Sequence, residues 1–380
     1  MSDRSKVAVL FTSASTILED IDRLMGLAEV EKHLSKDAVT SLKINISWHK
    51  YYPACSTTPW QLDGVVRGLA SRGFDKSMMD VPQNSTVVVD TKIGEVANRL
   101  KPVIDHHGIR SIYLNDPDAE WITYEPKRPM LVLDKVYEKK GIRIPKALLG
   151  KNIVHLPTVK THVFTTITGA MKNAFGGLLQ FDRHWTHAVI HDTLSDLLMI
   201  QKDIHPGIFT VMDGTIAGEG PGPRAMIPHE KNVILASGDS VAIDAVSAKL
   251  QGFDPMSLRF IRKAHELGLG TGDPREIDVV GDDISGVDFR FTQGDTFASK
   301  GQKVIYHGAL KPLEHLLLRT PIVPWSYFAS RIYHDLYWYN VVGKKRIAGL
   351  KDSQWLRLFD AYRNGPPPPE TFKRAKAVGQ

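Results

Sequence analysis

The sequence has few of the residues and motifs that mark several large protein classes. Its 380 residues include one cysteine, Cys55, which excludes an intramolecular disulfide and any all-cysteine zinc or iron–sulfur site within one chain. No run of 18 apolar residues occurs, so no transmembrane helix is predicted. The phosphate-binding sequence G-K-[ST], the dinucleotide fingerprint G-x-G-x-x-G and the zinc motif H-E-x-x-H are also missing.

The N-terminal residues and the distribution of charge indicate where the protein is located and which partners it binds. Residues 1–6 are polar and only a short apolar run follows, which is not the pattern of a signal peptide, so we expect a cytoplasmic location. Residues 300–380 hold 14 Lys and Arg against 5 Asp and Glu, whereas the whole chain has a formal net charge of +6. The positive charge therefore belongs to the C-terminal fifth. Since no nucleic-acid-binding motif accompanies it, we expect no nucleic-acid partner.

Short apolar runs alternate with helical patterns through most of the chain. We expect strands at 7–11, 41–48, 85–90, 111–114, 153–156, 208–213, 233–236 and 277–280, and helices at 15–34, 58–73, 95–106, 188–202, 241–250 and 257–267. This alternation predicts an α/β fold with a mainly parallel sheet covered by helices on both faces. Ligands of such sheets bind beyond the carboxyl ends of the strands.

The sequence changes character near residue 300. We expect a body of residues 1–300, a helical, aromatic-rich extension at 301–365 and a disordered tail at 366–380. The extension is too short to build a core of its own, so Trp338 and Trp355 should be buried on the body, with Lys344, Lys345 and Arg346 in solvent. The alternatives are a homodimer contact or a membrane-surface contact through 308–365, because Trp and Tyr beside Lys and Arg suit lipid headgroups.

Residues 152–179, NIVHLPTVKTHVFTTITGAMKNAFGGLL, form the stretch around which the rest is organised. Lys160, His162, Lys172 and Asn173 lie there among Thr and Gly, whereas a helix selected for stability alone would contain more Leu, Glu and Ala. Thr and Gly favour backbone held close to a bound group, and the cations suit a carboxylate or phosphate. The alternative is a strand, a turn and a Gly-interrupted core helix with two solvated lysines.

A second candidate segment is residues 213–223, DGTIAGEGPGP, which follow a predicted strand. The amides of Gly218, Gly220 and Gly222 are expected to approach a ligand, and Asp213 and Glu219 are candidate metal ligands or general bases. The alternative is a tight structural loop.

Three histidines form a third candidate group. Together with Ser195, His184, His187 and His191 would lie within an arc of about 80° on one helix, because successive residues rotate by about 100°. His187 and His191 are spaced i, i+4, which suits one divalent metal ion. The alternative is a polar stripe or a set of core histidines.

Several short motifs occur together in one order. They are K-x-N at Lys43 and Asn45, K-x-H…T-G…K-N…G-G in 160–177, D-G…E-G-x-G-P in 213–223 and S-x-D-x-V-A-x-D-A-V in 237–246. In these motifs the chain resembles the family called domain of unknown function 362, over about residues 43–281. The resemblance implies substrate-binding roles for Lys43 and Asn45. Many members of that family carry a ferredoxin-like cluster segment, which a chain with one cysteine lacks, so we expect no iron–sulfur cluster.

A shorter resemblance concerns the reaction type. His162 lies ten residues before Lys172, which is similar to the nickel-dependent lactate racemase family. There His and Lys hold a pyridinium-based pincer cofactor with its metal, and histidines take a proton from the carbon beside a carboxylate. The glycine-rich segment before the Lys of that family is not matched here. The resemblance therefore favours proton transfer without implying the cofactor.

These observations lead to two hypotheses. In the first the chain is an enzyme of isomerase or lyase type. Its small anionic substrate is bound by Lys160, Lys43, Asn45, Asn173 and the three loop glycines, and Lys172, His162, His187 and His191 do the acid–base work, with or without a divalent metal. In the second the same cleft carries a ligand without turning it over, and the basic tail docks a partner.

Overall fold

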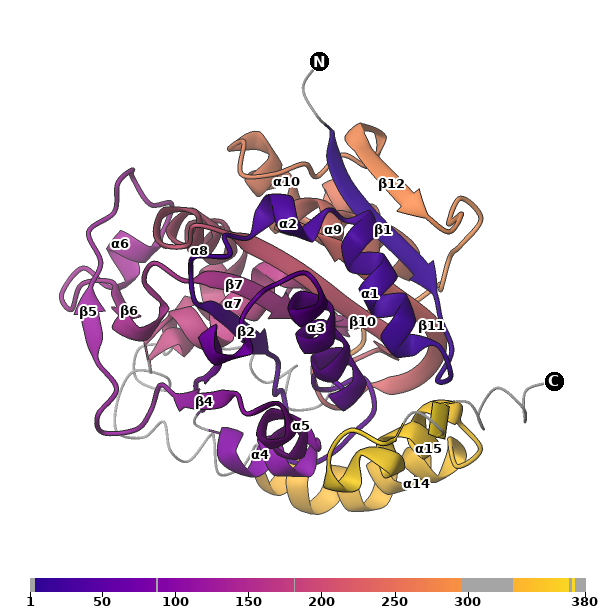
Figure 1. Ribbon diagram of the computed structural model, residues 1–380. Helices are drawn as coiled ribbons and strands as arrows, with labels where there is room; N and C mark the ends of the chain where they lie inside the picture. Colours follow the sequence, from indigo (N-terminus) through magenta and orange to yellow (C-terminus); the bar gives the residue numbers. More distant parts are fainter. Residues whose placement is uncertain (1–3, 87, 181, 296–330, 369–370, 373–380) are drawn as a thin grey trace.

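The computed structural model in Figure 1 describes residues 4–86, 88–180, 182–295, 331–368 and 371–372. A ten-stranded sheet runs through the middle in the order β12-β1-β11-β10-β7-β2-β3-β4, with β8 beside β10 and β9 beside β8. Its strands are β1 (Ser5–Phe11), β2 (Thr40–Ile44), β3 (Met79–Gln83), β4 (Arg110–Tyr113), β7 (Asn152–Leu156), β8 (Thr158–His162), β9 (Thr166–Ile167), β10 (Ile208–Glu219), β11 (Ile227–Ser237) and β12 (Ile277–Gly281). A separate two-stranded sheet pairs β5 (Trp121–Thr123) with β6 (Arg143–Pro145).

The main sheet is mostly parallel, as predicted. The strands β4, β3, β2, β7 and β10 are parallel to one another, and β1 is parallel to β12. Along the main path only β11 runs antiparallel to its neighbours, β10 and β1. β8 follows β7 after Pro157 and pairs with the later part of β10, where Lys160 lies opposite Gly218. The chain carrying Lys160 and His162 is therefore part of the sheet itself.

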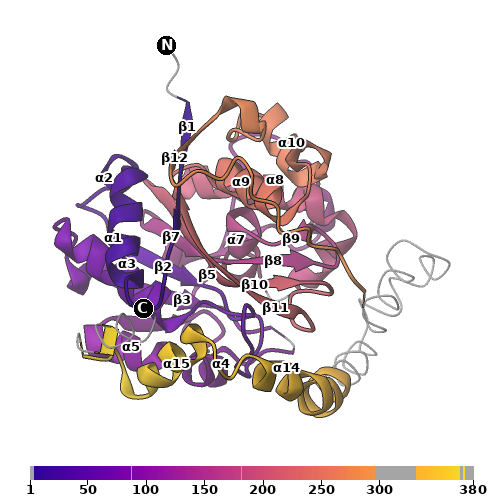
Figure 2. The same ribbon diagram turned by 90° about the vertical axis from the view of Figure 1, so that its right-hand side faces the viewer.

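Helices cover both faces, which confirms the predicted three-layer arrangement (Figures 1 and 2). One apolar cluster holds residues of α1 (Ile17–Leu27), α3 (Pro59–Ser71) and α5 (Leu100–His107). The other holds residues of α7 (Ala170–Leu178), α8 (Ile190–Ile204), α9 (Ser240–Gln251) and α10 (Arg259–Glu266). The short helices are α2 (Val30–His33), α4 (Thr91–Ala97) and α6 (Leu133–Val136).

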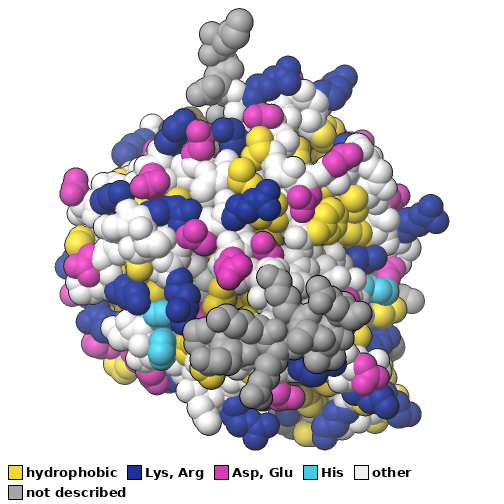
Figure 3. Space-filling model, turned by 45° about the vertical axis from the view of Figure 1, so that its right-hand side comes forward, with side chains coloured by type: hydrophobic (Ala, Val, Ile, Leu, Met, Phe, Trp, Pro, Cys, Tyr) yellow, Lys and Arg dark blue, Asp and Glu magenta, His cyan; other side chains and the backbone are white. Residues whose placement is uncertain are grey.

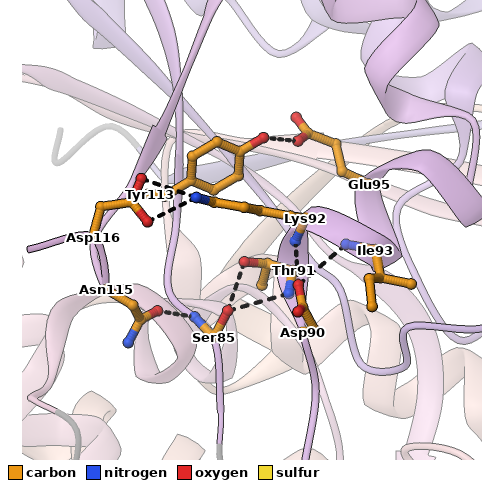
Figure 4. A network of polar contacts seen from close by, with 9 residues as sticks. All are labelled: Ser85, Asp90, Thr91, Lys92, Ile93, Glu95, Tyr113, Asn115 and Asp116. Atoms are coloured by element: carbon orange, nitrogen blue, oxygen red, sulfur yellow. Dashed lines mark hydrogen bonds and ion pairs between the residues drawn. The ribbon is translucent and has the colours of Figure 1, made fainter.

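The strand expected at residues 85–90 is wrong: the strand in that region is β3, Met79–Gln83, and residues 84–86 and 88–90 lie in a loop. The Thr86 hydroxyl accepts the backbone N–H groups of Val88 and Val89, at 3.2 and 2.9 Å, which keeps them from a strand ladder. Asp90 instead caps α4, and Lys92 pairs with Asp116 on the far side of the loop (Figure 4).

Two long predicted helices are each split by a residue with positive φ. Glu29, with φ of 53°, separates α1 from α2. Arg99, with φ of 57°, separates α4 from α5. Pro102 does not cause the second break, because it falls in the first turn of α5, where a missing N–H costs no helical hydrogen bond.

The described part of the C-terminal extension contacts the body through buried aromatic side chains. It consists of a π-helix, η7 (Ile332–Gly343), followed by α14 (Lys344–Gly349), α15 (Gln354–Ala361) and a 3-10 turn, η8 (Tyr362–Asn364). Trp355 is fully buried with its ring 5.4 Å from that of Trp60, and Trp338 lies 6.0 Å from Trp48. Residues 301–330 and most of the predicted disordered tail lie outside the described residues.

The basic side chains of the extension divide between solvent and body. Lys344 and Lys345 are exposed, as expected, and Figure 3 shows Lys and Arg along the lower edge of the molecule, the level of α14 and α15 in Figures 1 and 2. The expectation for Arg346 is wrong, because it donates to the carbonyl of Met226 at 2.7 Å. Within the described ranges no helix is long and apolar enough to span a bilayer.

Candidate anion-binding site

Four cationic side chains from the sheet, from α7 and from the turn after α7 influence one another's charge. Lys43 comes from β2, Lys160 from β8, Lys172 from α7 and Arg183 from the 3-10 turn η3 (Arg183–Val189); we call these four residues the cationic cluster. Lys43, Lys160 and Arg183 are 6%, 1% and 4% exposed, and Lys172 is partly exposed. Within the part of the chain that the structure describes, none of the four forms an ion pair. Buried charges are ordinarily paired, so this arrangement favours an anionic ligand.

Neutral groups hold the three lysines of the cluster in place. Nζ of Lys43 donates to the carbonyl of Ile44 at 2.5 Å, and Nζ of Lys160 donates to the carbonyl of Cys55 at 2.6 Å. Nζ of Lys172 lies 4.5 Å from the ring centre of Phe175. These partners orient the ammonium groups without neutralising their charge.

The three lysines of the cluster have lowered pKa values, as expected for buried cations that lack a counter-charge. Burial, with a smaller effect of the Arg183 charge, lowers the pKa of Lys43 from 10.5 to about 7. Burial and then the charges of Lys160 and Arg183 lower the pKa of Lys172 to about 7, and burial lowers that of Lys160 to about 8. For Lys43 the change disfavours the charged form by about 5 kcal/mol, since one pKa unit is about 1.4 kcal/mol. An anion bound here would recover much of that free energy.

Backbone close approach explains two glycines of the central stretch. A Cβ at Gly177 would lie 2.5 Å from Cε of Lys43, so the glycine leaves room for the lysine stem. A Cβ at Gly169 would lie 2.0 Å from Oδ1 of Asp244. That carboxylate comes from α9 and accepts the backbone N–H groups of Ala170 and Met171 at 2.6 and 3.1 Å, which begins α7. The glycines therefore fix both the start of α7 and the path of Lys43.

His162 and His187 have opposite tautomers. The Nδ1 atom of His162 accepts the backbone N–H groups of Phe164 and Thr165 at 3.2 and 3.3 Å, so the ring proton is on Nε2. The Nδ1 atom of His187 lies 3.0 Å from the carbonyl of His184, which only accepts, so Nδ1 carries the proton and Nε2 is the basic atom.

Both rings are neutral at neutral pH. Burial lowers the pKa of His162 well below its usual value and that of His187 to about 3, and in each case Lys172 is the charge with the largest further effect. One histidine thus offers a donor and the other an acceptor in the surroundings of Lys172.

The two predicted asparagines, Asn45 and Asn173, hydrogen-bond to the backbone that positions the lysines. Asn45 donates to the carbonyl of Cys55 at 3.1 Å and so shapes the loop on which Lys160 rests. Asn173 donates to the carbonyl of Lys43 at 2.7 Å and fastens α7 to β2. Their substrate-binding roles remain predictions.

The glycine-rich segment has a structural role that differs from the predicted one. A Cβ at Gly218 would lie 2.6 Å from the sulfur of Met226, and one at Gly222 would lie 1.9 Å from the carbonyl oxygen of Thr161. The amides of Gly220 and Gly222 donate to the carbonyls of Thr292 and Gly220, at 3.2 and 2.8 Å. Gly220 and Gly222 therefore use their amides within the protein, and the segment packs against the chain that carries Lys160 and His162. The ligand-binding role of the three glycines stays a prediction.

The four predicted metal ligands are not brought together. His187 lies in η3 and His191 in α8, so the two do not share one α-helix at i, i+4. Asp213 accepts from Thr58 and from Trp60, and Glu219 accepts from Thr292 and pairs with His229 at 2.8 Å. Across residues 4–295 and 331–372, apart from the positions left undescribed, no group of three or more His, Cys, Asp or Glu is arranged to hold a metal ion.

Sequence reasoning missed two residues of the site. Arg183 joins the cluster from a turn that precedes the helix predicted at 188–202, and its Nη2 donates to the carbonyl of Ser85 at 2.8 Å. Asn84 follows β3 and donates to the carbonyl of Leu179 at 3.1 Å. Correct placement of β3 would have shown Asn84 at the carboxyl end of a strand, next to Lys43 on β2.

The family described as "Domain of unknown function (DUF362)" matches residues 41–249, which is more than half of the chain and includes the whole cationic cluster. The chain belongs to the DUF362 family. The thylakoid-associated protein sll1697 of Synechocystis is 29% identical over 133 residues, 34% of this chain and 41% of that protein. This DUF362 chain thus aligns with less than half of that relative's length. No solved structure matches this chain.

Proposed function

We propose that this DUF362 chain is an enzyme that binds a small carboxylate or phosphate at the cationic cluster and moves a proton on it. The observation that carries the proposal is the burial of Lys43, Lys160 and Arg183 beside Lys172 without an ion pair among the described residues. Cations of this kind stabilise a bound anion and the charge that develops on it.

Lys172 is the proposed general base. With its pKa near 7, an appreciable fraction of its amine is neutral at neutral pH, and it reaches the surface while its neighbours do not. Removal of a proton from the carbon beside a carboxylate transfers that proton to Nζ of Lys172 and the electron pair to the carboxylate oxygens. Lys160 and the Nε2–H of His162 would stabilise the resulting charge, and the neutral Nε2 of His187 would accept a hydrogen bond from the ligand. The Lys172 ammonium then returns its proton to a carbon of the ligand in an isomerisation, or a leaving group departs from the adjacent carbon in an elimination. This chemistry is that of an isomerase or a lyase.

The test is proton exchange. The purified chain is incubated in D2O with a panel of small carboxylates, and loss of the signal of the proton beside the carboxylate is followed by NMR. We expect exchange by the wild type, loss of it in Lys172→Met and no change in the control Lys344→Met, whose side chain is exposed on α14. Anion binding without exchange on any substrate would favour the non-catalytic ligand carrier, and absence of anion binding would contradict both functions.

A further inference from the structure

The cationic cluster has two ends that Lys172 joins. The pKa of Lys172 is lowered by the charges of both Lys160 and Arg183. The pKa of Lys43 is lowered by the charge of Arg183. The hydrogen-bond partners separate the cations in the same way: Nζ of Lys160 is held by Ser47 and Cys55, whereas Lys43 donates to Ile44 and Arg183 to Ser85. The cations therefore form one group at Lys160 and a second at Lys43 and Arg183.

The second end contains buried polar atoms with no partner. Arg183 and Asn84 are 4% and 5% exposed, and in the described ranges Nη1 of Arg183 and Oδ1 of Asn84 have no hydrogen-bond partner. The remaining atoms of these side chains hold the two segments together, through Ser85 and Leu179. A buried guanidinium N–H without a partner is costly, so its retention beside Lys43 indicates a ligand group that accepts from it.

We propose that the substrate carries two anionic groups, as a dicarboxylate or a phosphorylated carboxylic acid does. One group binds at Lys160, next to the proposed base Lys172, and the other at Lys43 and Arg183, where the planar guanidinium suits a carboxylate or phosphate. Oδ1 of Asn84 accepts from an O–H or N–H of the ligand beside the second group. A single carboxylate would neutralise one end and leave the other buried and unpaired. This assignment rests on the proposed anion-binding function and adds the substrate class.

The test compares small anions of one and two charges on the full chain at low salt. Calorimetric titration with acetate, propionate, malonate and succinate measures the affinity of each. We expect at least one dicarboxylate to bind about tenfold or more tightly than acetate, since a charge-assisted hydrogen bond contributes enough for such a factor. Arg183→Met should bring the dicarboxylate affinity down to that of acetate, whereas the exposed control Arg128→Met should change neither.

A second variant covers the case in which Arg183→Met fails to fold. Asn84→Asp keeps the size of the side chain, gives up the hydrogen bond that Asn84 donates to Leu179 and adds a negative charge near Arg183, so it should remove the advantage of the dicarboxylate while acetate still binds. Equal affinities for acetate and both dicarboxylates in the wild type would overturn the two-anion inference and leave the proposed anion site standing. Failure of every anion to bind would overturn both.

Discussion

The Cβ that Gly177 lacks would lie 2.5 Å from Cε of Lys43, while a Cβ at its neighbour Gly176 would meet nothing within 4 Å. Two adjacent glycines of one helix thus differ completely in what surrounds them. Gly177 gives the buried lysine its path from β2 past α7, and Gly176 faces open space.

This contrast gives a matched pair of substitutions. Gly177→Ala should displace the Lys43 ammonium, because a flexible lysine stem gives way more easily than backbone, and anion affinity should fall by about tenfold, the loss of one charge-assisted hydrogen bond. Gly176→Ala should leave affinity unchanged and raise stability by up to about 1 kcal/mol through helix propensity. Titration with a small carboxylate and urea unfolding measure both. Equal affinities in the two variants would contradict the role of Gly177.

The lowered lysine pKa values predict a pH dependence of stability. Lys43, Lys160 and Lys172 have pKa values of about 7, 8 and 7 in the fold against an ordinary 10.5, so the unfolded chain binds more protons between pH 8 and 10 and the free energy of unfolding rises with pH there. Burial raises the pKa of Asp244 to about 8, which opposes the trend below that pH.

Urea unfolding of the ligand-free chain at low salt checks this slope. Each lysine contributes up to about 1.4 kcal/mol per pH unit between pH 8 and 9.5, so Lys172→Met should flatten the rise by up to that amount. Lys344→Met, on the exposed face of α14, should keep the wild-type slope. A free energy that stays level or falls across this range in the wild type would show that the lysines are compensated in the fold.

The structural role of His162 and its proposed role as a donor can be separated by substitution. Its Nδ1 atom accepts two backbone N–H groups, so His162→Ala should lower stability by about 1–3 kcal/mol through the buried donors it leaves. His162→Asn places an amide oxygen near the position of Nδ1 and removes Nε2–H. We expect the asparagine variant to keep most of the stability and lose the proton-exchange activity. An asparagine variant with full activity would exclude His162 as the donor.

The extension should be required for the stability of the body. Trp355 packs on Trp60 and donates to Oδ1 of Asn232 at 2.7 Å, and the hydroxyl of Tyr362 donates to the buried carboxylate of Asp63 at 2.8 Å. Trp355→Ala should cost about 3–5 kcal/mol, measured by urea unfolding.

Deletion of residues 331–380 should expose the cluster around Trp60 and cause aggregation, measured by light scattering. A truncated chain that stays folded and active and has lost only liposome binding would support the membrane-surface role instead. The exposed apolar side chains Ile332, Leu336, Tyr337 and Val341 of η7 make that comparison informative.

The sequence predicts the layered α/β fold because apolar runs and helical periodicity are local signals, and Lys160, His162 and Lys172 were found because cations among Thr and Gly are unusual. Arg183 and Asn84 were missed because their roles depend on where β3 and η3 lie, which no local pattern encodes. The run at 85–90 has strand composition, yet the Thr86 hydroxyl takes the amides that a strand would use.

The extension shows a second limit of prediction from the sequence. In η7 the buried residues His334, Trp338 and Gly343 are four and five positions apart, as i→i+5 hydrogen bonding requires. Neither the helical nor the strand period used to analyse a sequence detects that spacing. The burial of Trp338 could nevertheless be expected, because a segment this short needs the body to cover its aromatics.

The contact between Gly169 and Asp244 has a consequence for how this family can diverge. The carboxylate occupies the volume of any side chain at 169 and accepts the first amides of α7 in place of a cap from the helix's own chain. A substitution at 169 would expel the carboxylate, and a shorter residue at 244 would leave both amides and a void. We therefore expect positions 169 and 244 to co-vary. Relatives that replace the aspartate should tolerate a side chain in place of the glycine. They should also carry a capping residue of their own before α7.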